Sequence, residues 1–160
     1  TNLNIDDEIN LIKVETAEEM FKATQENLPV DIAIFSAAVA DFKVNKKDST
    51  KIKKQDKLTL NLEKNIDILN YVSNHNSMRP KLVIGFAAET NDIDKNALSK
   101  LENKNCDWII ANDVSRKDSG FESDYNEVFI YYKNKKEKLA FKKKSEISEE
   151  IVDRIINQIN

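Results

Sequence analysis

Three short segments of the chain carry residue types that could bind a phosphorylated ligand. Residues 36–42 (SAAVADF) place small side chains before a carboxylate, so a ligand could approach the backbone there. Residues 51–54 (KIKK) put three cations within four positions, and lysines neutralise the charge of a nucleotide or of a pyrophosphate leaving group. Residues 85–90 (GFAAET) combine small side chains with one aromatic ring. These segments together indicate nucleotide binding through lysines and backbone donors.

Each feature also has a simpler structural interpretation. The small residues 36–40 could pack against a helix, with Asp41 as a turn residue. The lysines of 51–54 could protect an edge strand from pairing with other chains, and Phe86 could fill the core. Lys100 and Lys104, four apart on an expected helix, could be ordinary surface charge. Residue type and spacing alone leave these alternatives open.

Glycine usage excludes the common phosphate-binding loops. Gly85 and Gly120 are too far apart for a Walker sequence or a dinucleotide fingerprint. A triphosphate would therefore need lysines and helix N-termini. The single Cys106 and single His75 exclude a Cys/His zinc site and argue against thiol catalysis, so both are interpreted as structural or incidental.

Composition limits the class of protein. The chain has 160 residues, a usual length for one domain, with 40% hydrophobic and 33% charged residues and a net charge of -3. This balance argues against nucleic-acid and anionic-membrane partners. No apolar run could span a bilayer and the start has no signal-peptide features, so we expect a cytoplasmic location. We expect a single domain over 1–160, cut from a longer chain because Thr1 is not an initiator methionine.

Alternating strand and helix patterns predict the fold that must position these residues. Expected strands cover 11–14, 30–35, 58–62, 81–88, 108–111, 128–132 and 138–141, and expected helices cover 17–27, 66–74, 92–104 and the segment from Ser145 onward. Thr16 and Asn65 are expected N-caps, and 41–50 an expected loop. This order predicts an α/β, three-layer Rossmann-like fold with a mostly parallel sheet and a hairpin around 134–135. Ligands in such folds bind at the carboxyl ends of the strands.

Further segments complete an ordered set: residues 65–68 (NIDI), 79–80 (RP) and 110–114 (IANDV). In this order and spacing the chain resembles phosphopantothenate–cysteine ligases, the ligase part of the bifunctional flavoprotein of coenzyme A biosynthesis. The resemblance runs from about residue 11 to 126. It implies that CTP activates the carboxylate of 4′-phosphopantothenate as an acyl cytidylate, from which cysteine displaces CMP. It also implies Mg²⁺ with the CTP, a homodimer formed through the strands after the lysine-rich loop, and FMN only if a decarboxylase half lies upstream.

The resemblance also assigns roles to individual residues. Lys51 matches the lysine that the family needs to form the acyl cytidylate. Residues 35–37 match a stretch whose main chain recognises the cytosine base in the family. Residues 66–69 match the start of a helix that lies near the phosphates. The full set of implied nucleotide-binding residues is Phe35, Ser36, Ala37, Asp41, Lys51, Ile66, Asp67, Ile68, Leu69, Phe86, Lys100 and Lys104. Protein ligands of the metal are left open.

Two departures from the family pattern define the alternatives. Ile66 stands where the family usually has a proline that presets the first helical turn. The family's N-terminal segment, with its Ser-Asn-containing substrate loop, is not in these residues. The chain could therefore be a catalytically silent module for CTP binding or dimerisation. A generic nucleotide-sugar or dinucleotide enzyme is less favoured because the glycine fingerprint is missing.

Overall fold

The computed structural model describes residues 8–45, 50, 53, 56–114 and 123–160. Helices and strands alternate through these residues. The elements are α1 (Ala17–Glu26), β1 (Ile32–Phe35), β2 (Phe42–Val44), β3 (Leu62–Lys64), α2 (Ile68–Ser73), β4 (Leu82–Glu89), α3 (Ile93–Lys104), β5 (Trp108–Asp113), β6 (Tyr125–Tyr132), β7 (Lys136–Lys143) and α4 (Lys144–Ile159).

The main sheet has the strand order β1-β4-β5-β6-β7. β1, β4 and β5 are parallel, and the β6–β7 hairpin continues the sheet in antiparallel fashion. β4 begins with four buried residues in succession, as expected of a parallel strand covered on both faces. The predicted mostly parallel α/β sheet and the predicted hairpin are thus confirmed.

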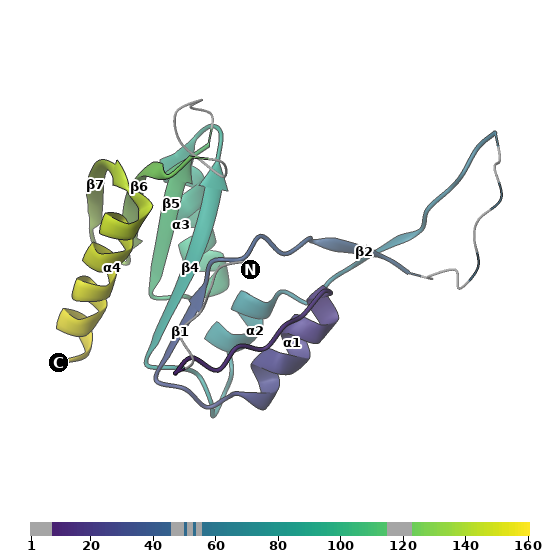
Figure 1. Cartoon of the computed structure of the whole chain (residues 1–160), viewed down its shortest axis with the longest axis horizontal. Coiled ribbons are helices and arrows are strands. Elements are labelled where there is room, and N and C mark those ends of the chain that lie inside the picture. Colours follow the sequence, from purple (N-terminus) through teal and green to yellow (C-terminus); the bar gives the residue numbers. More distant parts are fainter. Residues whose placement is uncertain (1–7, 46–49, 51–52, 54–55, 115–122) are drawn as a thin grey trace.

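Helices cover both faces of this sheet. On one face, Ala97 and Leu101 of α3 pack against residues of β4, β5 and β6. On the other, Ile147, Ile151 and Ile155 of α4 pack against the alternate side chains of the same strands. Figure 1 shows α4 lying along one side of the sheet. The three-layer arrangement predicted from the sequence is confirmed.

A second, two-stranded sheet projects from this body. β2 and β3 pair antiparallel, and Figure 1 shows β2 in the part of the chain that extends away from the main sheet. Phe42 lies opposite Lys64 and Val44 opposite Leu62. The predicted strand at 58–62 is therefore shifted toward β3, and the predicted loop at 41–50 is partly wrong because it contains β2. The last backbone hydrogen bond between the two segments runs from Asn45 N to Asn61 O. Leu58 and Leu60 therefore have no strand opposite them among the described residues.

The chain start and the entry to α2 differ from expectation. Residues 11–14 form no strand, because no described strand lies beside them to complete a hydrogen-bonded ladder. α2 begins two residues later than predicted and is capped by Asp67, not Asn65. The Asn65 amide instead donates to Ala40 O at 2.8 Å, and Asn65 N donates to Asp41 O at 2.8 Å. Asn65 thus closes the base of the β2–β3 arm.

The start of α1 follows the predicted capping box. Glu19 N donates to Thr16 Oγ1 and Thr16 N donates to Glu19 Oε2, both at 3.1 Å. These two bonds satisfy backbone donors that a helix start otherwise leaves unpaired. Across the described residues, no helix combines the length and apolar character needed to cross a bilayer.

Candidate functional site

A cavity of about 410 Å³ opens beyond the carboxyl end of β1. Its walls come from α1, from the segment after β1, from the start of α2, from β4 and from α3. All the predicted nucleotide-binding residues that the structure describes line it. They are Phe35, Ser36, Ala37, Asp41, Ile66, Asp67, Ile68, Leu69, Phe86, Lys100 and Lys104. Lys51 lies outside the described residues.

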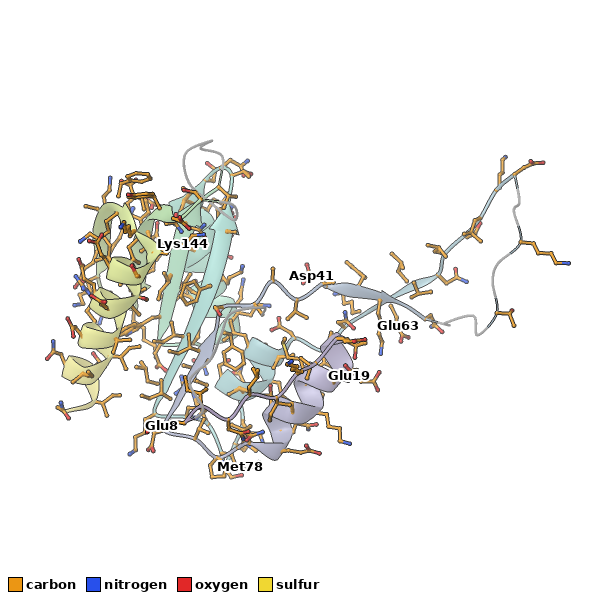
Figure 2. The ribbon with its side chains drawn as sticks, in the orientation of Figure 1. Glu8, Glu19, Asp41, Glu63, Met78 and Lys144 are labelled. Carbon is orange, nitrogen blue, oxygen red and sulfur yellow. The ribbon has the colours of Figure 1, made fainter. Side chains whose placement is uncertain are left out.

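Strand pairing explains why distant segments meet here. Phe35 lies opposite Gly85 in the β1–β4 ladder, so the segment that follows β1 runs beside Phe86. Parallel strands end at the same edge of a sheet, and the small side chains of Ser36 and Ala37 leave that edge open. Asp41, at the base of the arm, ends this wall (Figure 2).

The start of α2 forms the second wall. Asp67 caps the helix, with Asn70 N donating to its Oδ1 at 2.9 Å. Leu69 lies over Gly85: a Cβ at position 85 would be 2.7 Å from Leu69 Cδ2. The absent side chain of Gly85 is what lets α2 approach β4 this closely.

Lys100 and Lys104 form the third wall, one helical turn apart on α3. Their side chains are 35% and 30% exposed, and each has a carboxylate partner on another element. Lys104 Nζ pairs with Asp67 Oδ2, and Lys100 Nζ lies 3.9 Å from Glu89 Oε1. Both lysines line the cavity and each has a carboxylate partner, so neither is an isolated charge on the surface.

A second cavity, of about 580 Å³, adjoins the first. The residues that line both cavities are Ser36, Ala37, Val39, Asp41, Phe86 and Lys100. It extends over β5, β6 and the start of α4, where the polar residues that line it are Asn112, Asn126, Lys144 and Ser148. Figure 2 labels Lys144 at the start of α4.

Of these residues, sequence reasoning missed Asn126, Lys144 and Ser148. Asn112 belongs to a quoted motif, and its place at the end of a buried strand was a usable signal. Asn126 and Lys144 reach the cavity only because the β6–β7 hairpin and α4 fold back along the sheet. That pairing is long-range and leaves no local signal at either residue.

The surroundings of Cys106 and His75 fit structural roles for both residues. Burial raises the pKa of the Cys106 thiol to about 11, which suppresses the reactive thiolate. His75 Nδ1 accepts a hydrogen bond from Met78 N at 3.1 Å, and its ring contacts Tyr71 edge-on. Neither residue is among the walls of the two cavities described above.

Comparison with known proteins identifies the chain's relatives. A profile of the family described as DNA/pantothenate metabolism flavoprotein C-terminal domain matches residues 1–159. The chain is 40% identical over 159 residues to the coenzyme A biosynthesis bifunctional protein CoaBC of Haemophilus influenzae, covering 98% of this chain and 39% of that protein. It is 40% identical over 147 residues to CoaBC of Bacillus subtilis, covering 90% of this chain and 36% of that protein.

Solved structures show the same relationship. The crystal structure of the C-terminal domain of a CoaBC matches with a TM-score of 0.76 and 30% identity, covering 99% of this chain and 70% of that one. A DNA/pantothenate metabolism flavoprotein from Streptococcus pneumoniae shares the fold, with a TM-score of 0.76 and 19% identity. The chain thus spans about two fifths of its curated CoaBC relatives. It belongs to the DNA/pantothenate metabolism flavoprotein C-terminal domain family.

Proposed function

We propose that this chain carries the ligase function of coenzyme A biosynthesis, in which CTP drives the joining of 4′-phosphopantothenate to cysteine. The observation that carries this proposal is the first cavity, which gathers the expected nucleotide-binding residues of four separate segments into one space. Membership of the family supports the same assignment.

The reaction needs charge neutralisation and positioning more than a protein nucleophile. A carboxylate oxygen of 4′-phosphopantothenate attacks the α-phosphorus of CTP, and the bond to the β-phosphate oxygen breaks to release pyrophosphate. The cysteine amine then attacks the acyl carbon, loses a proton and displaces CMP. In this proposal Lys100 and Lys104 bind the phosphates, and the position of both residues in the cavity wall supports that role.

The remaining walls suit the nucleoside. Ser36 and Ala37, which follow Phe35, offer backbone groups with little side-chain bulk, and a cytosine edge needs such access to form hydrogen bonds with the backbone. Phe86 supplies a partly buried ring at the junction of the two cavities. We place the nucleotide in the first cavity and the acyl substrate toward the second, so that the reacting carboxylate meets the α-phosphate near Asp41.

Magnesium fits this site as a companion of the phosphates. No group of three or more His, Cys, Asp or Glu side chains that could hold a metal occurs in the described part of the chain. Mg²⁺ ordinarily uses one or two carboxylates together with substrate phosphates, and Asp41 lines the cavity. Bound there, the ion would neutralise phosphate charge during pyrophosphate departure.

Two measurements test the proposal. Calorimetric titration with CTP, ATP and NAD in Mg²⁺ buffer should show selective CTP binding, and a preference for NAD would contradict it. Release of pyrophosphate should then require both CTP and 4′-phosphopantothenate.

Lys51→Gln tests the assigned activating lysine. We expect pyrophosphate release to fall at least about a hundredfold, because charge on the reacting phosphate loses its stabilising cation. Lys57→Gln removes an equal charge farther along the same segment and should retain most of the rate. Unchanged pyrophosphate release in Lys51→Gln would refute the role.

A silent CTP-binding module is the second candidate. CTP binding without pyrophosphate release would support this candidate. Pyrophosphate release without formation of the cysteine product would support a chain that activates the acid but does not complete the ligation.

A further inference from the structure

The Asp67 carboxylate joins two walls of the first cavity. Its Oδ1 accepts the hydrogen bond from Asn70 N that caps α2, and its Oδ2 pairs with Lys104 Nζ on α3. The backbone of Lys104 is also fixed, because Ser73 Oγ and Asn74 Nδ2 donate to its carbonyl oxygen. Lys104 is therefore held by α2 at both its carbonyl and its ammonium group.

This pairing matters because of where the carboxylate lies. Asp67 is a wall of the cavity, whereas Glu89, the more distant partner of Lys100, is not. Among the described residues, the charged ones that line the cavity are Asp41, Asp67, Lys100 and Lys104, two of each sign. A phosphate that binds Lys104 must come close to the Asp67 carboxylate or displace it.

The electrostatic consequence differs between forms of the nucleotide. A free triphosphate carries about four negative charges, and a neighbouring carboxylate repels each of them. The repulsion energy grows as solvent is excluded from the site. Magnesium bound to the phosphates neutralises two of these charges and so weakens their repulsion by a nearby carboxylate. A carboxylate paired with a phosphate-binding lysine therefore penalises the metal-free nucleotide most.

We propose that Asp67 is a positioning residue that holds Lys104 across the cavity and makes the site select the magnesium complex of the nucleotide over the free triphosphate. The inference deepens the proposed function and rests on it, since it concerns the same nucleotide cavity. Lys104 supplies the phosphate contact, and Asp67 acts through Lys104 and through its own charge.

Asp67→Asn separates the charge from the helix cap. Asparagine is as good an N-cap as aspartate, so α2 should keep its start while the carboxylate is lost. We expect CTP affinity measured in EDTA to rise about threefold to tenfold, because a phosphate no longer meets a competing anion. Affinity in excess Mg²⁺ should change less than about twofold, so the magnesium preference falls.

Matched variants exclude a general charge effect. Asp31 pairs with Lys81 at 2.9 Å and does not line the cavity, so Asp31→Asn removes the same charge elsewhere and should leave the magnesium preference unchanged. Lys104→Gln should weaken CTP binding in both buffers, more in EDTA, because Asp67 then stays in the cavity unneutralised. Asp67→Ser, which also provides a capping oxygen, repeats the test if Asp67→Asn does not fold.

The outcomes separate this inference from the proposed function. If the unaltered chain binds no CTP in either buffer, the proposed function fails and the role of Asp67 falls with it. If the chain binds CTP, three results would overturn only the role of Asp67. These are weaker metal-free CTP binding in Asp67→Asn, an unchanged magnesium preference in Asp67→Asn, or the same change in magnesium preference in Asp67→Asn and Asp31→Asn. A selective gain for metal-free CTP supports it.

Discussion

Gly85 shows how much of the cavity depends on a single missing side chain. It lies in β4 between the β1 and β5 ladders, where Leu69 of α2 and Ile109 of β5 converge. A Cβ at this position would lie 2.7 Å from Leu69 Cδ2 and 2.9 Å from Ile109 Cδ1. Leu69 is itself a wall of the cavity, so the packing of the core and the shape of the site are linked at this residue.

Gly85→Ala should destabilise the fold by about 1–2 kcal/mol, because the crowded atoms are ends of flexible side chains that can partly move aside. CTP affinity should also fall, since Leu69 would be pushed toward the cavity. Chemical denaturation and calorimetry measure the two effects. In a Leu69→Ala background, Gly85→Ala should cost less stability than it does in the unaltered chain, and strictly additive effects would contradict this explanation.

For individual residues, the sequence predicted which ones lie near each other in the cavity, but it did not predict which side chains form ion pairs. Ser36 and Asp41 could be placed because they follow an apolar run of strand length, and Phe86 because it lies toward the carboxyl end of another such run. The partnership of Asp67 with Lys104 could not, because it depends on how closely α2 packs on α3. Asn65 and Asp67 are both suitable N-caps, and the pairing of β2 with β3 decides between them by using Asn65 at the base of the arm.

The attachment of α4 combines apolar packing with a charged contact to the hairpin. Three isoleucines of α4 enter the core, and Arg154 Nε donates to Glu137 Oε2 of β7 at 2.9 Å. Hydrogen bonds from Lys135 and Arg154 lower the pKa of Glu137 from 4.5 to about 2. Because α4 also forms one wall of the second cavity, this contact supports the site indirectly.

The lowered pKa of Glu137 predicts an acid-sensitive stability. The carboxylate stabilises the fold fully above the unfolded-state pKa near 4.5, and this contribution is lost as the pH falls through the folded-state pKa of about 2. Glu137→Gln should therefore reduce stability at neutral pH and flatten its decline between about pH 5 and pH 2. Denaturant titrations across this range measure the slope.

Glu149 provides the control for this prediction. It is an exposed carboxylate on the same helix as Arg154, so Glu149→Gln should leave the pH dependence of stability unchanged. An equal flattening in both variants would show that total charge, and not the Glu137 contact, sets the slope.

Elements that carry their own signals were predicted best. Thr16 and Glu19 define the start of α1 locally, and the buried runs of β4 and β5 are continuous in the sequence. Strands that need a neighbour were predicted worst. Residues 11–14 and Leu58 have strand-like patterns, but no described strand lies opposite them to form the ladder.

The shape of the whole molecule is set by a compact body and a projecting arm. Phe42 and Leu62 on the arm are 53% and 57% exposed, which is unusual for large apolar side chains on a thin two-stranded ribbon. An isolated ribbon of two strands is marginally stable in water, so a second copy of the arm would both bury these residues and support the ribbon. We therefore expect a homodimer through β2 and β3.

Leu62→Lys should convert that dimer to a monomer, because it places a charge within the expected contact. Leu98 on α3 is also a leucine, 45% exposed, and Leu98→Lys should leave the dimer intact. Analytical ultracentrifugation distinguishes the two states. A chain that is monomeric at high micromolar concentration before any substitution would contradict a dimer formed through the arm.

The central claim is that the first cavity binds the nucleotide. Backbone amide NMR of the isotopically labelled chain, titrated with CTP and Mg²⁺, tests it most directly. The largest shifts should occur at Ser36 and Ala37, at Leu69 and along the face of α3 that carries Lys100 and Lys104. Shifts concentrated at the far end of the sheet, around Arg79 and Asp107, or no shifts at saturating CTP, would contradict the claim.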